Sequence, residues 1–122
     1  MSDDRLIIRA SEMTDMGRKE GGFFCLLERN RLGLGQLSVA VSDNPPGTEV
    51  ATHRHACGEV FVVYDGRGIY TVGDAEILAL PGDIVVVPPN TWHSFRSDGE
   101  QGLRHVAAYD RGDVNIEFAA PA

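Results

Sequence analysis

The chain has 122 residues, of which 43% are hydrophobic, and its formal net charge is −7. This length suits one small domain with its own core, and the composition is neither that of a disordered chain nor that of a membrane-embedded one. The acidic balance argues against nucleic acid and anionic membranes as partners, because both bind basic surfaces, and no apolar run approaches the roughly 18 residues of a transmembrane helix.

The first residues, Met1 to Asp4, contain neither a basic segment nor an apolar one, so we expect no secretory signal here. Only two cysteines are present, Cys25 and Cys57. Two cysteines in a chain of this length do not form a disulfide framework, and they suit a reducing compartment. We therefore expect a cytoplasmic protein.

Residues 1–33 are predicted to form an N-terminal arm with strand character. The run Phe23 to Leu27 follows a Gly-Gly pair and is rich in residues that favour a packed sheet. Because this run is apolar on both faces, it has two interpretations. It either lies against a second subunit in a homodimer, or it covers one end of its own domain.

The next predicted strand is Leu34 to Ser42. Within it, Gln36 shares a face with Leu34 and Ala40, so its amide either orients a ligand inside the domain or faces solvent on a half-buried strand. A turn at Asp43–Gly47 follows, because proline fixes φ and glycine permits positive values.

The chemistry of the chain is concentrated around two histidines and a glutamate that follow this turn. His53 and His55 are two residues apart, so they project to the same side of an extended chain. The segment Ala56 to Gly58 can turn the chain back, and Glu59 then begins an apolar run that can return its carboxylate to the two imidazoles. Two nitrogens and one oxygen at one point predict a divalent metal site.

Short strands at regular spacing complete the chain. We predict strands at 69–72, 75–80 and 84–87, a further strand that carries His93, and a last strand at 103–109 that carries His105. Gly and Pro turns divide them, with a tight hairpin connection at Gly73-Asp74. Strands of about four to six residues at this spacing indicate an all-β sandwich or barrel, and no helical periodicity is convincing.

Two motifs in this region resemble those of the cupin superfamily, in its small single-domain form with one conserved barrel. The first motif matches at every defined position: Gly47, His53, His55, Glu59 and Gly66. The fold that this resemblance implies is a double-stranded β-helix, or jelly roll, which we expect over residues 34–122 as one domain with the arm.

The second motif matches less completely, through Gly82, Pro88 and His93. Asn90 stands where the family usually has glycine, and Ser97 where it often has asparagine. Neither is a ligand position, and asparagine tolerates positive φ better than most residues, so these departures concern the geometry of the turn more than metal binding.

By this resemblance, His53, His55, Glu59 and His93 are the ligands of one divalent metal ion, which can be iron, manganese, nickel or zinc. Such a ligand set leaves open positions for a small-molecule ligand that binds through oxygen, or for a substrate together with dioxygen. Glu59 could detach from the metal and accept a proton. His105 is the second catalytic candidate, with a structural role as the alternative. We interpret Cys57 as a small residue of the turn, and we expect Trp92 to pack away from the metal.

The resemblance implies several functions without selecting one. The first hypothesis is a metal-dependent enzyme of dioxygenase type that acts on a small oxygenated organic molecule. The alternatives are a non-catalytic metal-containing module that binds or senses a small ligand, and a metal-dependent isomerase or decarboxylase. Oxygen consumption would separate the first hypothesis from the last.

Overall fold

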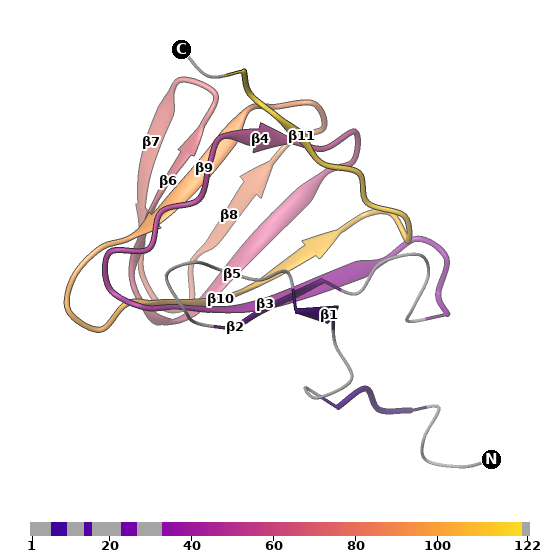
Figure 1. The fold of residues 1–122 in the computed structure, drawn as a ribbon, viewed down its shortest axis with the longest axis horizontal. Helices are drawn as coiled ribbons and strands as arrows, with labels where there is room; N and C mark the ends of the chain where they lie inside the picture. The colour runs from indigo at the N-terminus through magenta and orange to yellow at the C-terminus, as the bar shows by residue number, and fades with distance from the viewer. Residues whose placement is uncertain (1–5, 10–13, 16–22, 27–32, 121–122) are drawn as a thin grey trace.

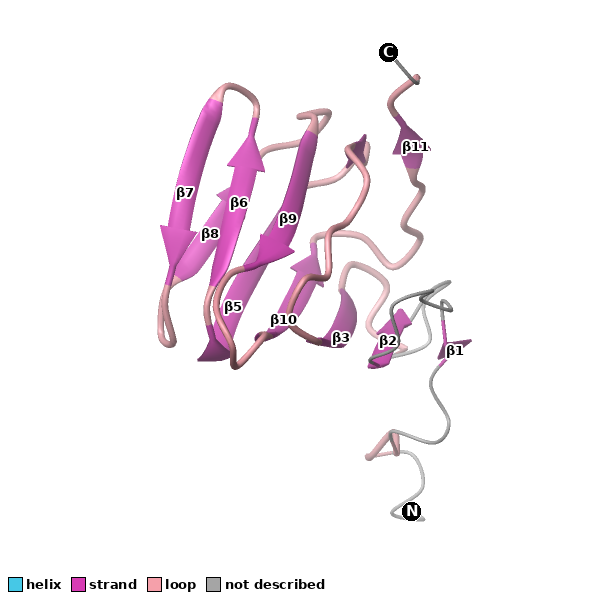
Figure 2. Ribbon diagram, turned by 60° about the vertical axis from the view of Figure 1, so that its left-hand side comes forward, coloured by secondary structure: helices cyan, strands magenta, loops and turns pink. Residues whose placement is uncertain are grey.

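In the computed structural model, the secondary structure of the described residues consists of β-strands arranged in two antiparallel sheets (Figure 1). The structure describes residues 6–9, 14–15, 23–26 and 33–120. Within these ranges there is no helix of the length and apolarity that crossing a bilayer requires. The two sheets face each other as the layers of a sandwich (Figure 2), which confirms the predicted jelly-roll architecture.

One sheet contains six strands in the order β1-β2-β3-β10-β5-β8. Its strands are β1 (Thr14–Asp15), β2 (Phe23–Leu26), β3 (Ser38–Asn44), β10 (Leu103–Tyr109), β5 (Glu59–Gly66) and β8 (Ile84–Val87). The pairing of β2 with β3 makes the N-terminal run part of this sheet. Leu27, the last residue of the predicted run, lies outside the described residues.

The second sheet contains five strands in the order β11-β4-β9-β6-β7. Its strands are β11 (Glu117–Phe118), β4 (His53–Arg54), β9 (His93–Ser97), β6 (Gly68–Val72) and β7 (Ala75–Ala79). The turn between β6 and β7 falls at Gly73 and Asp74, where the sequence predicts a hairpin connection. Two other predicted strands, 84–87 and 103–109, also have the observed bounds.

One predicted strand is wrong at its start. The strand expected from Leu34 begins only at Ser38, and it runs on to Asn44. Gly33 and Gly35 have φ of 72° and 78°, values outside the range of a β-strand. The backbone N–H of Gln36 donates a hydrogen bond to the Leu34 carbonyl at 2.9 Å. Gln36 is therefore an exposed residue of a bend, not a barrel-facing residue of a strand.

The core lies between the two sheets and is mainly aromatic in its middle. Alternate residues of β3 and β10 are buried, as a period of two requires. Phe61, Tyr70 and Phe95 come from three strands, are at most 4% exposed, and have ring centroids 5.1 to 5.8 Å apart. Rings at these separations are in contact, so this part of the interior is filled by side chains.

Candidate metal centre

Two histidines face each other across adjacent strands of the five-stranded sheet. His53 on β4 is the direct antiparallel partner of His93 on β9, and their ring centroids are 4.3 Å apart. The two side chains are 8% and 1% exposed. Pairing of the two strands therefore brings together residues that lie 40 positions apart in the sequence.

His55 reaches the same place from the segment that follows β4. Its ring centroid lies 5.0 Å from that of His53 and 5.2 Å from that of His93. The backbone at His55 is held by Asn90, whose backbone N–H donates a hydrogen bond to the His55 carbonyl at 2.7 Å. Asn90 has φ of 59°, so it adopts the left-handed conformation that the family's usual glycine would favour, as its tolerance of positive φ predicts.

Glu59 comes from the opposite sheet, at the first position of β5, and is 3% exposed. Its Oε1 atom lies 2.9 Å from Nε2 of His93 and 3.4 Å from Nε2 of His55. The four residues that the sequence singles out are thus neighbours, with two histidines on strands of one sheet and the carboxylate on the other.

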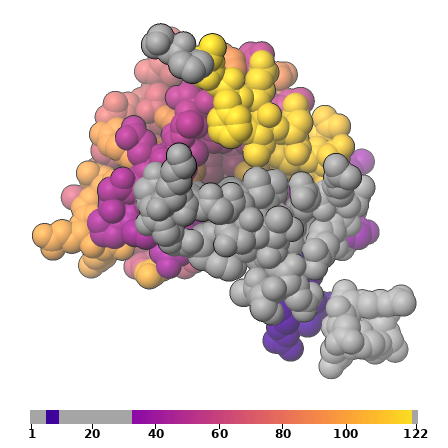
Figure 3. All heavy atoms as spheres, in the orientation of Figure 1, coloured from indigo at the N-terminus to yellow at the C-terminus, as the bar shows by residue number. Residues whose placement is uncertain are grey.

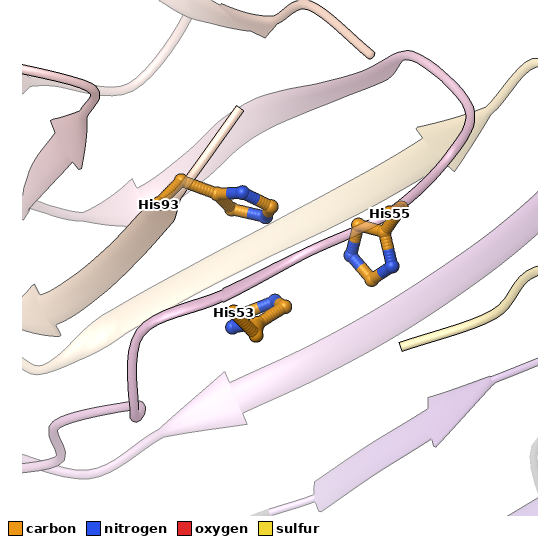
Figure 4. Close-up of side chains that lie close together, drawn as sticks. All are labelled: His53, His55 and His93. Carbon is orange, nitrogen blue, oxygen red and sulfur yellow. The ribbon is translucent and has the colours of Figure 1, made fainter. Parts of the chain in front are cut away.

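Each histidine ring is oriented by a backbone carbonyl. Nδ1 of His53 lies 2.7 Å from the Ala51 carbonyl, Nδ1 of His93 lies 2.8 Å from that of Thr91, and Nδ1 of His55 lies 2.6 Å from that of Asn115. A carbonyl only accepts hydrogen bonds, so each Nδ1 carries the proton and each neutral ring keeps its Nε2 lone pair free. Figure 4 shows the three rings turned toward a common space.

These atoms form a suitable donor set for a cation. Possible ligand atoms of His53, His55 and His93 all lie within 4.8 Å of one another. Nε2 of His55, Nε2 of His93 and Oε1 of Glu59 are buried and have no hydrogen-bond partner among the described residues. Three lone-pair atoms packed this closely repel one another, and a divalent ion satisfies all of them at once. The residues present therefore fit the predicted metal.

The pKa values of these groups reflect two opposing effects, burial and the neighbouring ligand groups. The pKa of His53 is lowered to about 4, mainly by burial and also by the neighbouring imidazoles. Burial opposes ionisation of Glu59, but the nearby rings of His55 and His93 outweigh it and lower the pKa of the carboxyl to about 2. Burial opposes protonation of His55, but the nearby Glu59 carboxylate and the Asn115 carbonyl outweigh it and raise the pKa of this ring.

The C-terminal segment supports the ligand strand, a role that the sequence did not predict. β11 pairs with β4, so Phe118 is the partner of His53, and Glu117 binds Arg54 through a 2.8 Å ion pair. Asn115 accepts from the Ala56 amide through Oδ1 at 3.1 Å, in addition to its bond with His55. Figure 3 shows this segment, in yellow, on the surface of the molecule.

The remaining candidate residues are not part of the three-histidine group. His105 is 1% exposed, and its Nδ1 lies 2.6 Å from the Tyr70 hydroxyl, with the rings of Phe61 and Phe95 at 4.8 and 4.6 Å. Cys57 is a free, buried cysteine in the bend after His55. Trp92 is 36% exposed and stacks against the Arg54 guanidinium at 4.3 Å.

Comparison with known proteins finds a matching family and several relatives. A family model of the cupin domain matches residues 40–109. Gentisate 1,2-dioxygenase of a Ralstonia species is 28% identical in an alignment of length 102 that covers 79% of this chain and 29% of that protein. Auxin-binding protein 1 of Arabidopsis thaliana is 25% identical in an alignment of length 93 that covers 69% of this chain and 47% of that protein. The chain thus spans less than half the length of either relative.

A solved structure of similar size has the same fold. The uncharacterized protein with a double-stranded β-helix domain from Klebsiella pneumoniae matches with a TM-score of 0.73 and 22% sequence identity. The match covers 94% of this chain and 97% of that one. The two chains therefore have about the same length and the same fold.

Proposed function

The chain belongs to the cupin domain family, and from this premise we propose that it is a metal-dependent enzyme of dioxygenase type. The observation that carries the proposal is the convergence of three buried histidines and one carboxylate on a single point. Similarity to gentisate 1,2-dioxygenase supports this class of reaction. The substrate class that we propose is a small oxygenated organic molecule.

The proposed cofactor is one divalent ion, which His53, His55, Glu59 and His93 would hold. When bound, such an ion polarises ligand oxygen atoms and, if it is iron, manganese or nickel, activates dioxygen. Three neutral imidazoles and one carboxylate leave the loaded site with a net charge near +1, which favours an anionic or enediol-like substrate. The chain itself contributes burial, which excludes water, and fixed ring tautomers.

The filled interior favours a small substrate. Phe61 packs on the rings of Tyr70 and Phe95, and its ring centroid is 6.2 Å from that of His93. A substrate must therefore fit beside the ligands without displacing this ring. For proton transfer we propose Glu59 as the main group. His105 remains a second candidate, with its Nδ1 bonded to Tyr70.

The test combines metal analysis with oxygen uptake. Protein purified without chelator or added metal is analysed for elements, and oxygen consumption is then measured with hydroxylated aromatic acids and hydroxy-keto compounds. Near-stoichiometric iron, nickel or manganese together with uptake supports the proposal, and Glu59→Gln should abolish the uptake. A site that takes up no metal, or a loaded protein that consumes no oxygen with any of these compounds, contradicts it.

Similarity to an auxin-binding protein favours a second candidate function, a metal-containing module that binds a small ligand without turnover. The same loaded protein distinguishes the two. Saturable binding of a small carboxylic acid in a calorimetric titration, with no product formed, would support the binding module. Product without oxygen uptake would instead indicate an isomerase or decarboxylase.

We further propose that the protein is a cytoplasmic homodimer. The buried free thiol of Cys57 suits a reducing compartment. The outer face of β5 and β8 exposes Val62, Tyr64, Ile84 and Val86 by 36 to 62%, and an apolar surface of this kind is typical of an interface. Light scattering tests the dimer, and cell fractionation tests the compartment. A monomer at micromolar concentration, or a membrane-associated or secreted protein, would contradict the respective proposal.

A further inference from the structure

The buried hydroxyl of Tyr109 lies against the ligand set and has no role in the function proposed above. Tyr109 ends β10 and is the direct cross-strand partner of Glu59 on β5. The residue is 5% exposed, and its ring packs edge-on against that of His55 with a centroid separation of 5.2 Å. Tyr109 is thus in contact with two of the four predicted ligands.

The two oxygens of Glu59 have different surroundings. The Tyr109 side chain hydrogen-bonds the Glu59 carboxylate, to which a phenol can only donate. Oε1 faces Nε2 of His55 and of His93 and has no hydrogen-bond partner among the described residues. The hydroxyl therefore donates its hydrogen bond to Oε2, and Oε1 is the oxygen that faces the histidines.

We propose that Tyr109 is a positioning residue that occupies Oε2, so that Glu59 offers a metal only Oε1. The inference rests on the proposed metal centre. A carboxylate can bind a metal through one oxygen or through both, and the second oxygen would fill a position that a substrate needs. A phenol is protonated at neutral pH, so the hydroxyl remains a donor.

Tyr70 provides a matched control for this role. It is fully buried, and its hydroxyl is bonded to Nδ1 of His105 rather than to a predicted ligand. Tyr70→Phe and Tyr109→Phe each remove one buried hydroxyl and keep the ring. A general loss of packing or stability affects both variants, whereas a loss of ligand positioning affects only Tyr109→Phe.

The experiment loads wild type, Tyr109→Phe and Tyr70→Phe with Co²⁺ and measures affinity by calorimetry and coordination by visible absorption. We expect Tyr109→Phe to bind Co²⁺ about 10- to 100-fold more weakly and to show a changed spectrum, the size of effect typical of groups that orient a metal ligand. Tyr70→Phe should keep the wild-type affinity and spectrum. In a Glu59→Gln background, Tyr109→Phe should cause little further loss, because its effect acts through Glu59.

Unchanged affinity and spectrum in Tyr109→Phe, or equal changes in both variants, would overturn the inference. A wild-type protein that binds no Co²⁺ would instead overturn the metal centre itself, so the two failures are distinguishable. If Tyr109→Phe does not fold, a crystal structure of the cobalt-loaded wild type shows whether one or both oxygens of Glu59 bind the ion. Both oxygens of Glu59 within bonding distance of the ion would refute the proposed role of Tyr109, and one oxygen with Oε2 on the hydroxyl would support it.

Discussion

Replacement of His53 by glutamine should flatten the acid dependence of stability in the metal-free protein. Burial lowers the pKa of His53 to about 4 in the folded chain, against an unfolded value of 6.5. Between these values the unfolded chain binds a proton that the folded chain refuses, so stability is present above pH 6.5 and is lost as the pH falls toward 4. The loss is about 1.4 kcal/mol per pH unit, which amounts to about 2 kcal/mol by pH 5.

Urea unfolding of wild type and His53→Gln, in chelator at pH 7.5 and pH 5.0, measures this difference. The free energy of unfolding of the wild type should fall by about 2 kcal/mol more than that of the variant. Glu59 adds little to this comparison, because its pKa is lowered from 4.5 to about 2 and its contribution to stability is lost mainly between these values, below pH 5. Equal losses in the two proteins would refute the reasoning, since His53 would then titrate alike in the folded and unfolded chains.

Zn²⁺ at about 100 times its dissociation constant should stabilise the wild type by about 2.7 kcal/mol, and His93→Ala should lose most of this gain in thermal unfolding. The same rise in Tm in both proteins would contradict the ligand assignment. Metal affinity should fall as the pH falls from 8 to 5, because protons compete with the metal for Nε2 of the histidines and the pKa of His55 is raised. Calorimetric titration at each pH measures this affinity, and a constant affinity would argue against histidine ligation. Phe61→Ala should lower the free energy of unfolding by about 3 to 5 kcal/mol in urea, because the ring is 3% exposed and packs on Tyr70 and Phe95. A loss below about 1 kcal/mol would mean that this core is not tightly packed.

Local rules were enough to predict much of the site. The period of two places His53 and His55 on one side of the chain, and the bend at Ala56–Gly58 returns Glu59 to them. The resemblance supplied His93, and the pairing of β4 with β9 places it beside His53. Each of these steps depends on neighbours in the sequence or on a short motif, which is why one sequence could suggest them.

Contacts between distant segments were beyond the same reasoning. The carbonyl that orients His55 belongs to Asn115, 60 residues away, and no pattern in the sequence links the two. The partner of His105 is Tyr70, and the irregular register between β10 and β5 at Arg104 and His105 could not be foreseen from alternation alone. Gln36 is different, because the Gly33-x-Gly35 pattern could have indicated a bend before β3.

The candidate metal ligands are divided between the two sheets, so a bound ion would connect the sheets. His53 and His93 belong to the five-stranded sheet, and Glu59 belongs to the six-stranded one. An ion held by all three would cross-link the layers at one end, so the sandwich could not open there without releasing it. Backbone amides of β4, β5 and β9 should then exchange with deuterium more slowly, and as one unit, in the loaded protein. Amides of β7, at the far edge of its sheet, should keep their rates.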